Sequence, residues 1–203
     1  MKIRTLILFS TCSLMLASAC TPLGMATGAA AGVGTAASKE GGIGGAFTDA
    51  SIKAKINDAW LQYDIDTFSK LSTTVNQGRV LLTGVVQDPE DRVEAVRLVW
   101  QVPGVKQVMN EIRVADSEGA PGFVRDTWIT TRLRTALTFE KNVQSLNYSI
   151  DTVQGVVYLM GVAMNQQELD KVTQIARTIP NVKQVVNYVK MVGEPVTPQG
   201  VTQ

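Results

Sequence analysis

The chain has 203 residues, 45% of them hydrophobic, and a formal net charge of +1. It contains no histidine, which removes the commonest general base and metal ligand, and its two cysteines form no pair suited to a metal site. We therefore expect no catalytic residue, no cofactor, no metal and no nucleic-acid partner, and we expect that the protein is not an enzyme.

The N-terminus is typical of an exported protein. Lys2 and Arg4 precede an apolar run from Leu6 to Leu16, which is followed by small residues and Cys20. The run is too short to span a bilayer, which needs about twenty residues. The sequence Leu-Ala-Ser-Ala-Cys resembles a bacterial lipobox, so we predict a signal peptide over 1–19 and an acyl anchor on Cys20. The alternative is an ordinary signal peptide cleaved just before Cys20.

Residues 20–46 form a predicted tether that is rich in glycine and alanine. A stretch with so few large side chains buries little apolar area, which favours a flexible linker. Small residues also recur at every fourth position, which is the spacing of closely packed helices, so a helical tether is the alternative. These positions are Gly24, Gly28, Gly32 and Ala36.

The rest of the chain is an internal repeat with a period of 77 residues. This shift places Gly84 on Gly161 and Pro103 on Pro180 without a gap. It also aligns 77–78 with 154–155 and 105–108 with 182–185. We predict domain 1 over 47–115, a linker over 116–122, domain 2 over 123–192 and a disordered tail over 193–203.

Both domains show the same order of elements, α-β-β-α-β. A helix with apolar residues at helical spacing follows Asp49 in domain 1 and Asp126 in domain 2, and each aspartate is suited to N-capping. Two alternating strands then flank a Gln-Gly turn whose glycine is expected to need a positive φ. The predicted fold class is α+β: each domain is a three-stranded mixed sheet with two helices on one face, and its last two strands are parallel.

The second helix of each domain has its own start signal. Asp88-Pro89 begins it in domain 1, and Asn165 with Glu168 predicts a capping box in domain 2. The acids 88, 90, 91 and 94 cluster at this helix start, where the helix dipole explains them without a function. Trp60 is interpreted as core, and Trp100 as the core edge or a contact between the domains.

The repeated motifs resemble the BON domain, a family named for bacterial OsmY and nodulation proteins. They are Gly-x-Val-x-Leu-x-Gly at 78–84 and 155–161, and Pro-x-Val-x-x-Val-x-Asn at 103–110 and 180–187. A lipobox followed by two BON domains resembles outer-membrane lipoproteins of the DolP type, formerly YraP. The resemblance implies a periplasm-facing outer-membrane lipoprotein that supports envelope integrity at the division site. It also implies binding of anionic phospholipid through the first helix of domain 2.

The differences between the two copies point to the same helix. Residues 49–115 hold eight Lys/Arg and nine Asp/Glu, whereas 122–192 hold eight and five. Trp128 has Ser51 as its counterpart, so the fold does not require a large apolar side chain there. The candidate phospholipid-binding residues are Phe123, Arg125, Trp128, Arg132 and Thr135. Packing of Trp128 against domain 1 or the linker is the alternative.

A second hypothesis for the function remains open. The protein would be an interaction adaptor that recruits an envelope partner through domain 1 or through a sheet edge, and lipid contact would be incidental.

Overall fold

The structure is a computed structural model that describes residues 42–199, with side chains from Thr48 onward. The predicted signal peptide, the Cys20 anchor and residues 20–41 of the predicted tether lie outside the described residues. Within 42–199, no helix combines the length and the apolar character that crossing a bilayer requires.

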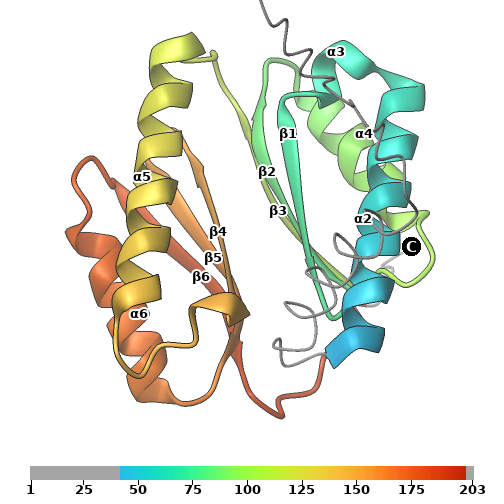
Figure 1. The fold of residues 1–203 in the computed structure, drawn as a ribbon. Helices are drawn as coiled ribbons and strands as arrows, with labels where there is room; N and C mark the ends of the chain where they lie inside the picture. Colours follow the sequence, from blue (N-terminus) through green and yellow to red (C-terminus); the bar gives the residue numbers. More distant parts are fainter. Residues whose placement is uncertain (1–41, 200–203) are drawn as a thin grey trace, which may run out of the picture.

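Two copies of one α-β-β-α-β arrangement follow each other along the chain (Figure 1). Domain 1 consists of α2 (Gly42–Tyr63), α3 (Ile65–Phe68), β1 (Leu71–Asn76), β2 (Arg79–Val86), α4 (Pro89–Trp100) and β3 (Gln107–Val114). Domain 2 consists of α5 (Gly119–Phe139), η1 (Ser145–Asn147), β4 (Tyr148–Val153), β5 (Val156–Ala163), α6 (Gln166–Thr178) and β6 (Gln184–Met191). The short helices α3 and η1 are the elements that the sequence analysis did not predict.

In each sheet the strand that is second in the sequence lies in the centre. The strand orders are β1-β2-β3 and β4-β5-β6. β1 and β4 run antiparallel to the central strand, whereas β3 and β6 run parallel to it. The two long helices of each domain cover one face of its sheet (Figure 1). The predicted fold class is therefore confirmed.

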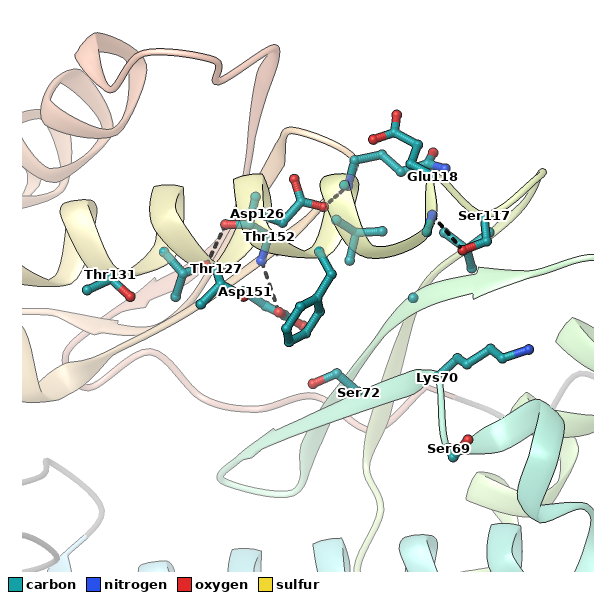
Figure 2. Close-up of a pocket in the computed structure, with 18 residues that line it drawn as sticks. Ser69, Lys70, Ser72, Ser117, Glu118, Asp126, Thr127, Thr131, Asp151 and Thr152 are labelled. Atoms are coloured by element: carbon teal, nitrogen blue, oxygen red, sulfur yellow. Dashed lines mark hydrogen bonds between the residues drawn. The ribbon is translucent and has the colours of Figure 1, made fainter.

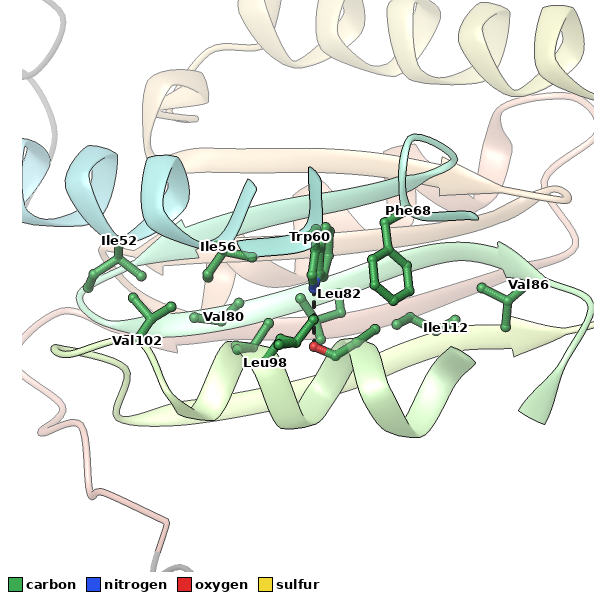
Figure 3. Packing of buried hydrophobic residues seen from close by; sticks show 12 residues of the cluster. Ile52, Ile56, Trp60, Phe68, Val80, Leu82, Val86, Leu98, Val102 and Ile112 are labelled. Atoms are coloured by element: carbon green, nitrogen blue, oxygen red, sulfur yellow. Dashed lines mark hydrogen bonds between the residues drawn. The ribbon is translucent and has the colours of Figure 1, made fainter. Parts of the chain in front are cut away.

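The core of each domain lies between its helices and its sheet. Figure 3 shows the core of domain 1. In domain 1, Ile52, Ile56 and Trp60 of α2 point onto β2 and α4, as their helical spacing predicted. The indole Nε1 of Trp60 donates to the carbonyl of Ala95 at 3.2 Å, which satisfies its polar atom inside the core. Trp60 is thus a core residue, as expected.

The first helix of each domain begins earlier than predicted. α2 starts at Gly42, within the expected tether, and α5 starts at Gly119, within the expected linker. Asp49 and Asp126 therefore lie inside helices, and the prediction that they are N-caps is wrong. Each carboxylate instead accepts from both N–H groups of a hairpin turn. The distances are 2.7 and 2.9 Å for Asp49 with Gln77 and Gly78, and 2.6 and 2.9 Å for Asp126 with Gln154 and Gly155.

Both hairpin turns have positive φ at their two central residues. The φ angles are 56° and 78° at Gln77 and Gly78, and 51° and 80° at Gln154 and Gly155. The prediction for the glycines is confirmed. A glutamine in this conformation is unusual, and the aspartate that binds its N–H helps to stabilise it.

Removing the hydrogen bonds between Asp126 and its hairpin turn should destabilise domain 2. We expect Asp126→Ala to lower the free energy of unfolding by about 3 kcal/mol, because two partly buried N–H groups lose a charged acceptor. Urea unfolding would measure the loss. The control is Asp170→Ala, which removes an exposed acid on α6 and should cost less than about 0.5 kcal/mol. Equal effects of the two substitutions would show that the turn does not depend on Asp126.

The second helices start where the sequence predicted. Asp88 accepts from the N–H of Glu90 at 2.8 Å, and Asn165 accepts from that of Glu168 at 2.9 Å. The predicted capping box is only half formed. The carboxylate of Glu168 is buried and binds the N–H groups of Gln144 and Met164, at 2.8 Å each, instead of returning to Asn165.

The two sheets pack against each other through the faces that their own helices leave free (Figure 1). Leu81 of β2 meets Val156, Tyr158 and Met160 of β5 in one buried cluster. Because both faces of β5 are covered, all of its residues are buried. The molecule has four layers, with helices outside and two sheets inside. These faces were not predicted from the sequence.

Polar side chains within this interface also join the domains. Arg79 donates to the carbonyl of Tyr188 at 2.7 Å. The hydroxyl of Tyr188 donates to Glu111, and that of Thr83 donates to Asp151. Burial and the nearby Glu111 carboxylate raise the pKa of Tyr158 to about 12. The domains are therefore held together by apolar packing and by specific hydrogen bonds.

The C-terminal segment returns to domain 1. The carbonyl of Thr197 accepts from the side chain of Gln107 at 2.6 Å, and the N–H of Gln199 donates to the carbonyl of Lys106 at 2.9 Å. The side chain of Gln199 accepts from the N–H of Val108 at 3.1 Å. Residues 193–199 were predicted to be disordered, but they bind the edge strand β3. The hydrogen-bonding groups that this edge leaves free explain the difference.

Candidate functional site

The outward face of α5 carries three of the five candidate residues. Ile129, Leu133 and Leu137 are buried against the sheet. Trp128, Arg132 and Thr135 lie on the opposite side of the helix, as the 100° step per residue requires. The Trp128 side chain is 44% exposed and does not line the cleft between the domains. The structure therefore brings Trp128, Arg132 and Thr135 together on one surface.

Two residues that the sequence analysis missed extend this surface. Val124 is 65% exposed and Phe139 is 83% exposed, and both fall on the same side of α5 as Trp128. We call the five residues Val124, Trp128, Arg132, Thr135 and Phe139 the outer stripe. At 1.5 Å per residue, the outer stripe is about 22 Å long.

Arg132 is the charged member of the outer stripe. No acid occurs between Thr127 and Phe139, whereas Arg132 and Arg134 both lie there, and Lys141 follows the helix. Among the ion pairs of the described residues, none involves Arg132 or Arg134. The outer stripe thus combines exposed apolar side chains with the guanidinium group of Arg132, while Arg134 lies on the flank of α5 nearer the cleft.

The other two candidates have different surroundings. Phe123 lines the cleft between the domains and does not belong to the outer stripe. Arg125 forms ion pairs with Glu118 at 2.5 Å and with Asp126 at 3.0 Å. Glu118 lies in the expected linker, so its ion pair with Arg125 was not predicted. The structure therefore places neither residue with Trp128.

The cleft itself lies between the first half of α5 and the start of β1 (Figure 2). It has a volume of about 570 Å³. Ser69, Lys70 and Ser72 face it from domain 1, and Thr127 and Thr131 face it from α5. The carboxylates of Asp126 and Asp151 are already bound, to the hairpin turn and to Thr83. The polar groups left in the cleft include the hydroxyls of these serine and threonine residues and the amino group of Lys70.

The described residues contain no group of three or more His, Cys, Asp or Glu side chains that could hold a metal ion. The exposed apolar and basic side chains of the outer stripe suit contact with a surface, through apolar burial and charge.

The chain was compared with known proteins. The family model of the BON domain matches residues 48–116 and 125–193. A protein of Anaplasma centrale, named only as an uncharacterized protein in the gshII 5′ region, is 43% identical over 70% of this chain and 94% of its own length. The osmotically-inducible protein Y of Escherichia coli is 31% identical, over 73% of this chain and 75% of its own length. The outer membrane lipoprotein DolP of Haemophilus influenzae is 26% identical, over 70% and 74%.

Proposed function

Because the chain belongs to the BON domain family and carries two tandem copies of that domain, we propose that it is an envelope lipoprotein that binds anionic phospholipid through α5. The family and the fold are those predicted from the sequence. Anchoring at Cys20, location in the outer membrane facing the periplasm, support of envelope integrity and a place at the division site all belong to the proposal. The relative that is named an outer membrane lipoprotein supports the location.

The outer stripe of α5 is the observation that carries the proposal. Aromatic side chains are favoured at the level of the lipid head groups, and guanidinium groups bind phosphate oxygens. Trp128 and Phe139 lie about 16 Å apart along the helix and can enter the same membrane surface. Arg132 lies between them, in position for a phosphate. The helix would lie flat in the interface, with Ile129, Leu133 and Leu137 still facing the sheet.

The proposed anchor reduces the affinity that α5 needs. A tethered domain meets the membrane at a high effective concentration, so a weak contact is enough to hold it there. Each lysine or arginine near an anionic surface contributes about 1 kcal/mol. Arg132 and Arg134 therefore supply a modest attraction, and the apolar side chains add to it.

A lipid titration followed by amide chemical shifts tests the proposal directly. Nanodiscs that contain phosphatidylglycerol should shift or broaden the amide signals of 124–139. Nanodiscs of phosphatidylcholine alone should have a much smaller effect, because they carry no net negative charge. Perturbation confined to domain 1, or equal for the two lipids, would contradict the proposed site.

A further inference from the structure

A second exposed apolar surface lies on domain 1, in a hollow of about 420 Å³ between the end of α2 and the first turn of α4. Tyr63 is 57% exposed and Val93 is 65% exposed, and both line the hollow with Pro89. The ring of Tyr63 is stacked on the buried Phe68, with 5.7 Å between the ring centroids. The hollow therefore has an apolar floor with one aromatic side chain already fixed by packing.

Acidic side chains surround this floor. Asp88, Glu90, Asp91 and Glu94 line the same hollow, and we call the whole site the acidic hollow. Among these four acids, only Glu94 has a cationic partner in the described part of the chain, Arg97 at 2.5 Å. Burial and the charges of Asp88 and Asp64 raise the pKa of Asp91. A cation bound here would relieve this repulsion.

The helix dipole explains acids at the start of α4, but it does not explain exposed apolar side chains beside them. The equivalent place in domain 2 shows what the fold itself requires. There, the counterparts of Tyr63 and Val93 are Glu140 and Asp170. The fold forms there without an apolar side chain at either position, so the shared fold does not by itself require Tyr63 and Val93.

The charge of the two places differs as well. Glu90 and Glu94 correspond to Gln167 and Lys171 in domain 2. Lys171 lies 3.6 Å from Glu140, so an ion pair occupies the place that is apolar in domain 1. The acidic hollow is therefore a specific feature of domain 1.

We propose that the acidic hollow binds a basic, amphipathic segment of a partner protein. An apolar side chain of the segment would lie between Tyr63 and Val93, while its lysine or arginine residues would meet Glu90 and Asp91. An anionic membrane would be repelled by the same acids, which favours a protein as the occupant. This role goes beyond lipid binding. The hollow and α5 belong to opposite outer layers of the molecule, so both can be occupied at once (Figure 1).

A synthetic peptide serves as the first probe. It has about fourteen residues, with leucine along one helical face and lysine elsewhere. Bound to the full chain, it should shift the amide signals of 63, 88 and 90–94. Two control peptides carry glutamate in place of lysine, or serine in place of leucine, and each should bind at least about tenfold more weakly. Equal binding of the serine peptide would overturn the proposal, because charge alone would then account for it. No binding of the leucine-lysine peptide would also overturn it.

A matched variant replaces Tyr63 and Val93 with the residue types that domain 2 has at the equivalent positions. Tyr63→Glu with Val93→Asp should weaken binding of the leucine-lysine peptide by at least about tenfold, although both changes add negative charge. Leu146→Asp, an exposed position on domain 2, is the control and should leave binding unchanged. Far-ultraviolet circular dichroism and the Tm check that both variants fold. Binding that survives the double substitution would overturn the proposal.

Cross-linking in cells identifies the natural occupant. A photoreactive residue at position 93 of the full chain should cross-link to a protein, and mass spectrometry of the linked segment should find basic residues flanking apolar ones. A link to lipid, to a second copy of this chain or to an acidic segment would contradict the proposed occupant. The absence of any link would do the same.

Discussion

Trp128→Glu should weaken the binding of residues 42–203 to anionic vesicles by about a hundredfold. The substitution removes a large apolar side chain from the membrane surface, which costs about 2 kcal/mol. It also places a negative charge among lipid phosphates, which costs about 1 kcal/mol more. The sum of about 3 kcal/mol corresponds to this loss of affinity. Cosedimentation with vesicles of phosphatidylglycerol and phosphatidylcholine would measure it.

The control is Leu146→Glu, which changes an exposed apolar residue of the same domain that does not belong to the outer stripe. It should leave vesicle binding within about a factor of two, since it removes no group from the proposed contact. Phe139→Glu should resemble Trp128→Glu, because Phe139 is even more exposed on the same stripe. Unchanged binding after both substitutions in the stripe would exclude α5 as the lipid-binding element.

Gly161→Ala should destabilise domain 2 by at least about 4 kcal/mol, which approaches the whole stability of a small domain. Gly161 lies in the central strand β5 with φ +141°. A Cβ atom there would lie 1.9 Å from the carbonyl oxygen of Asn147, so the backbone would have to move. Urea or thermal unfolding would measure the loss. The same substitution at Gly84 meets the carbonyl oxygen of Lys70 at 2.7 Å and should cost less.

Gly193→Ala separates the cost of a positive φ from the cost of the steric contact with Asn147. Gly193 also has a positive φ, of 78°, but no atom lies within 4 Å of an added Cβ. Its substitution should cost only about 1 kcal/mol, from the backbone conformation alone. A similar cost at positions 161 and 193 would mean that the contact with Asn147 relaxes easily.

The fold was predictable because each domain is encoded twice. Apolar spacing gave the helices and strands, and the repeat showed which positions the fold requires. Asp49 and Asp126 were misinterpreted because a short polar residue before an apolar helix face is typical of an N-cap. Their true partners are turn residues 28 and 29 positions further along the chain, which local patterns do not reveal.

The packing of one sheet on the other has a signature in the sequence, but a search for strands with alternating apolar residues does not detect it. β5 is an almost unbroken apolar run, which is typical of a strand covered on both faces. At the candidate site, comparing the copies found Trp128 against Ser51. The same comparison applied to Phe139, whose counterpart is Gln62, would have found the end of the stripe. The ion pairs of Arg125 were not predictable, because Glu118 belongs to a segment expected to be a linker.

The contact between the sheets is reciprocal: β2 meets β4, and its counterpart β5 meets β1. A surface that contacts its own equivalent is the arrangement of a homodimer with two-fold symmetry. A single ancestral domain with this surface would have paired with itself, and gene duplication would have made the pairing intramolecular. Identical subunits must share every change, whereas joined copies can evolve apart. That freedom accounts for an apolar, basic helix on one copy and an apolar, acidic hollow on the other.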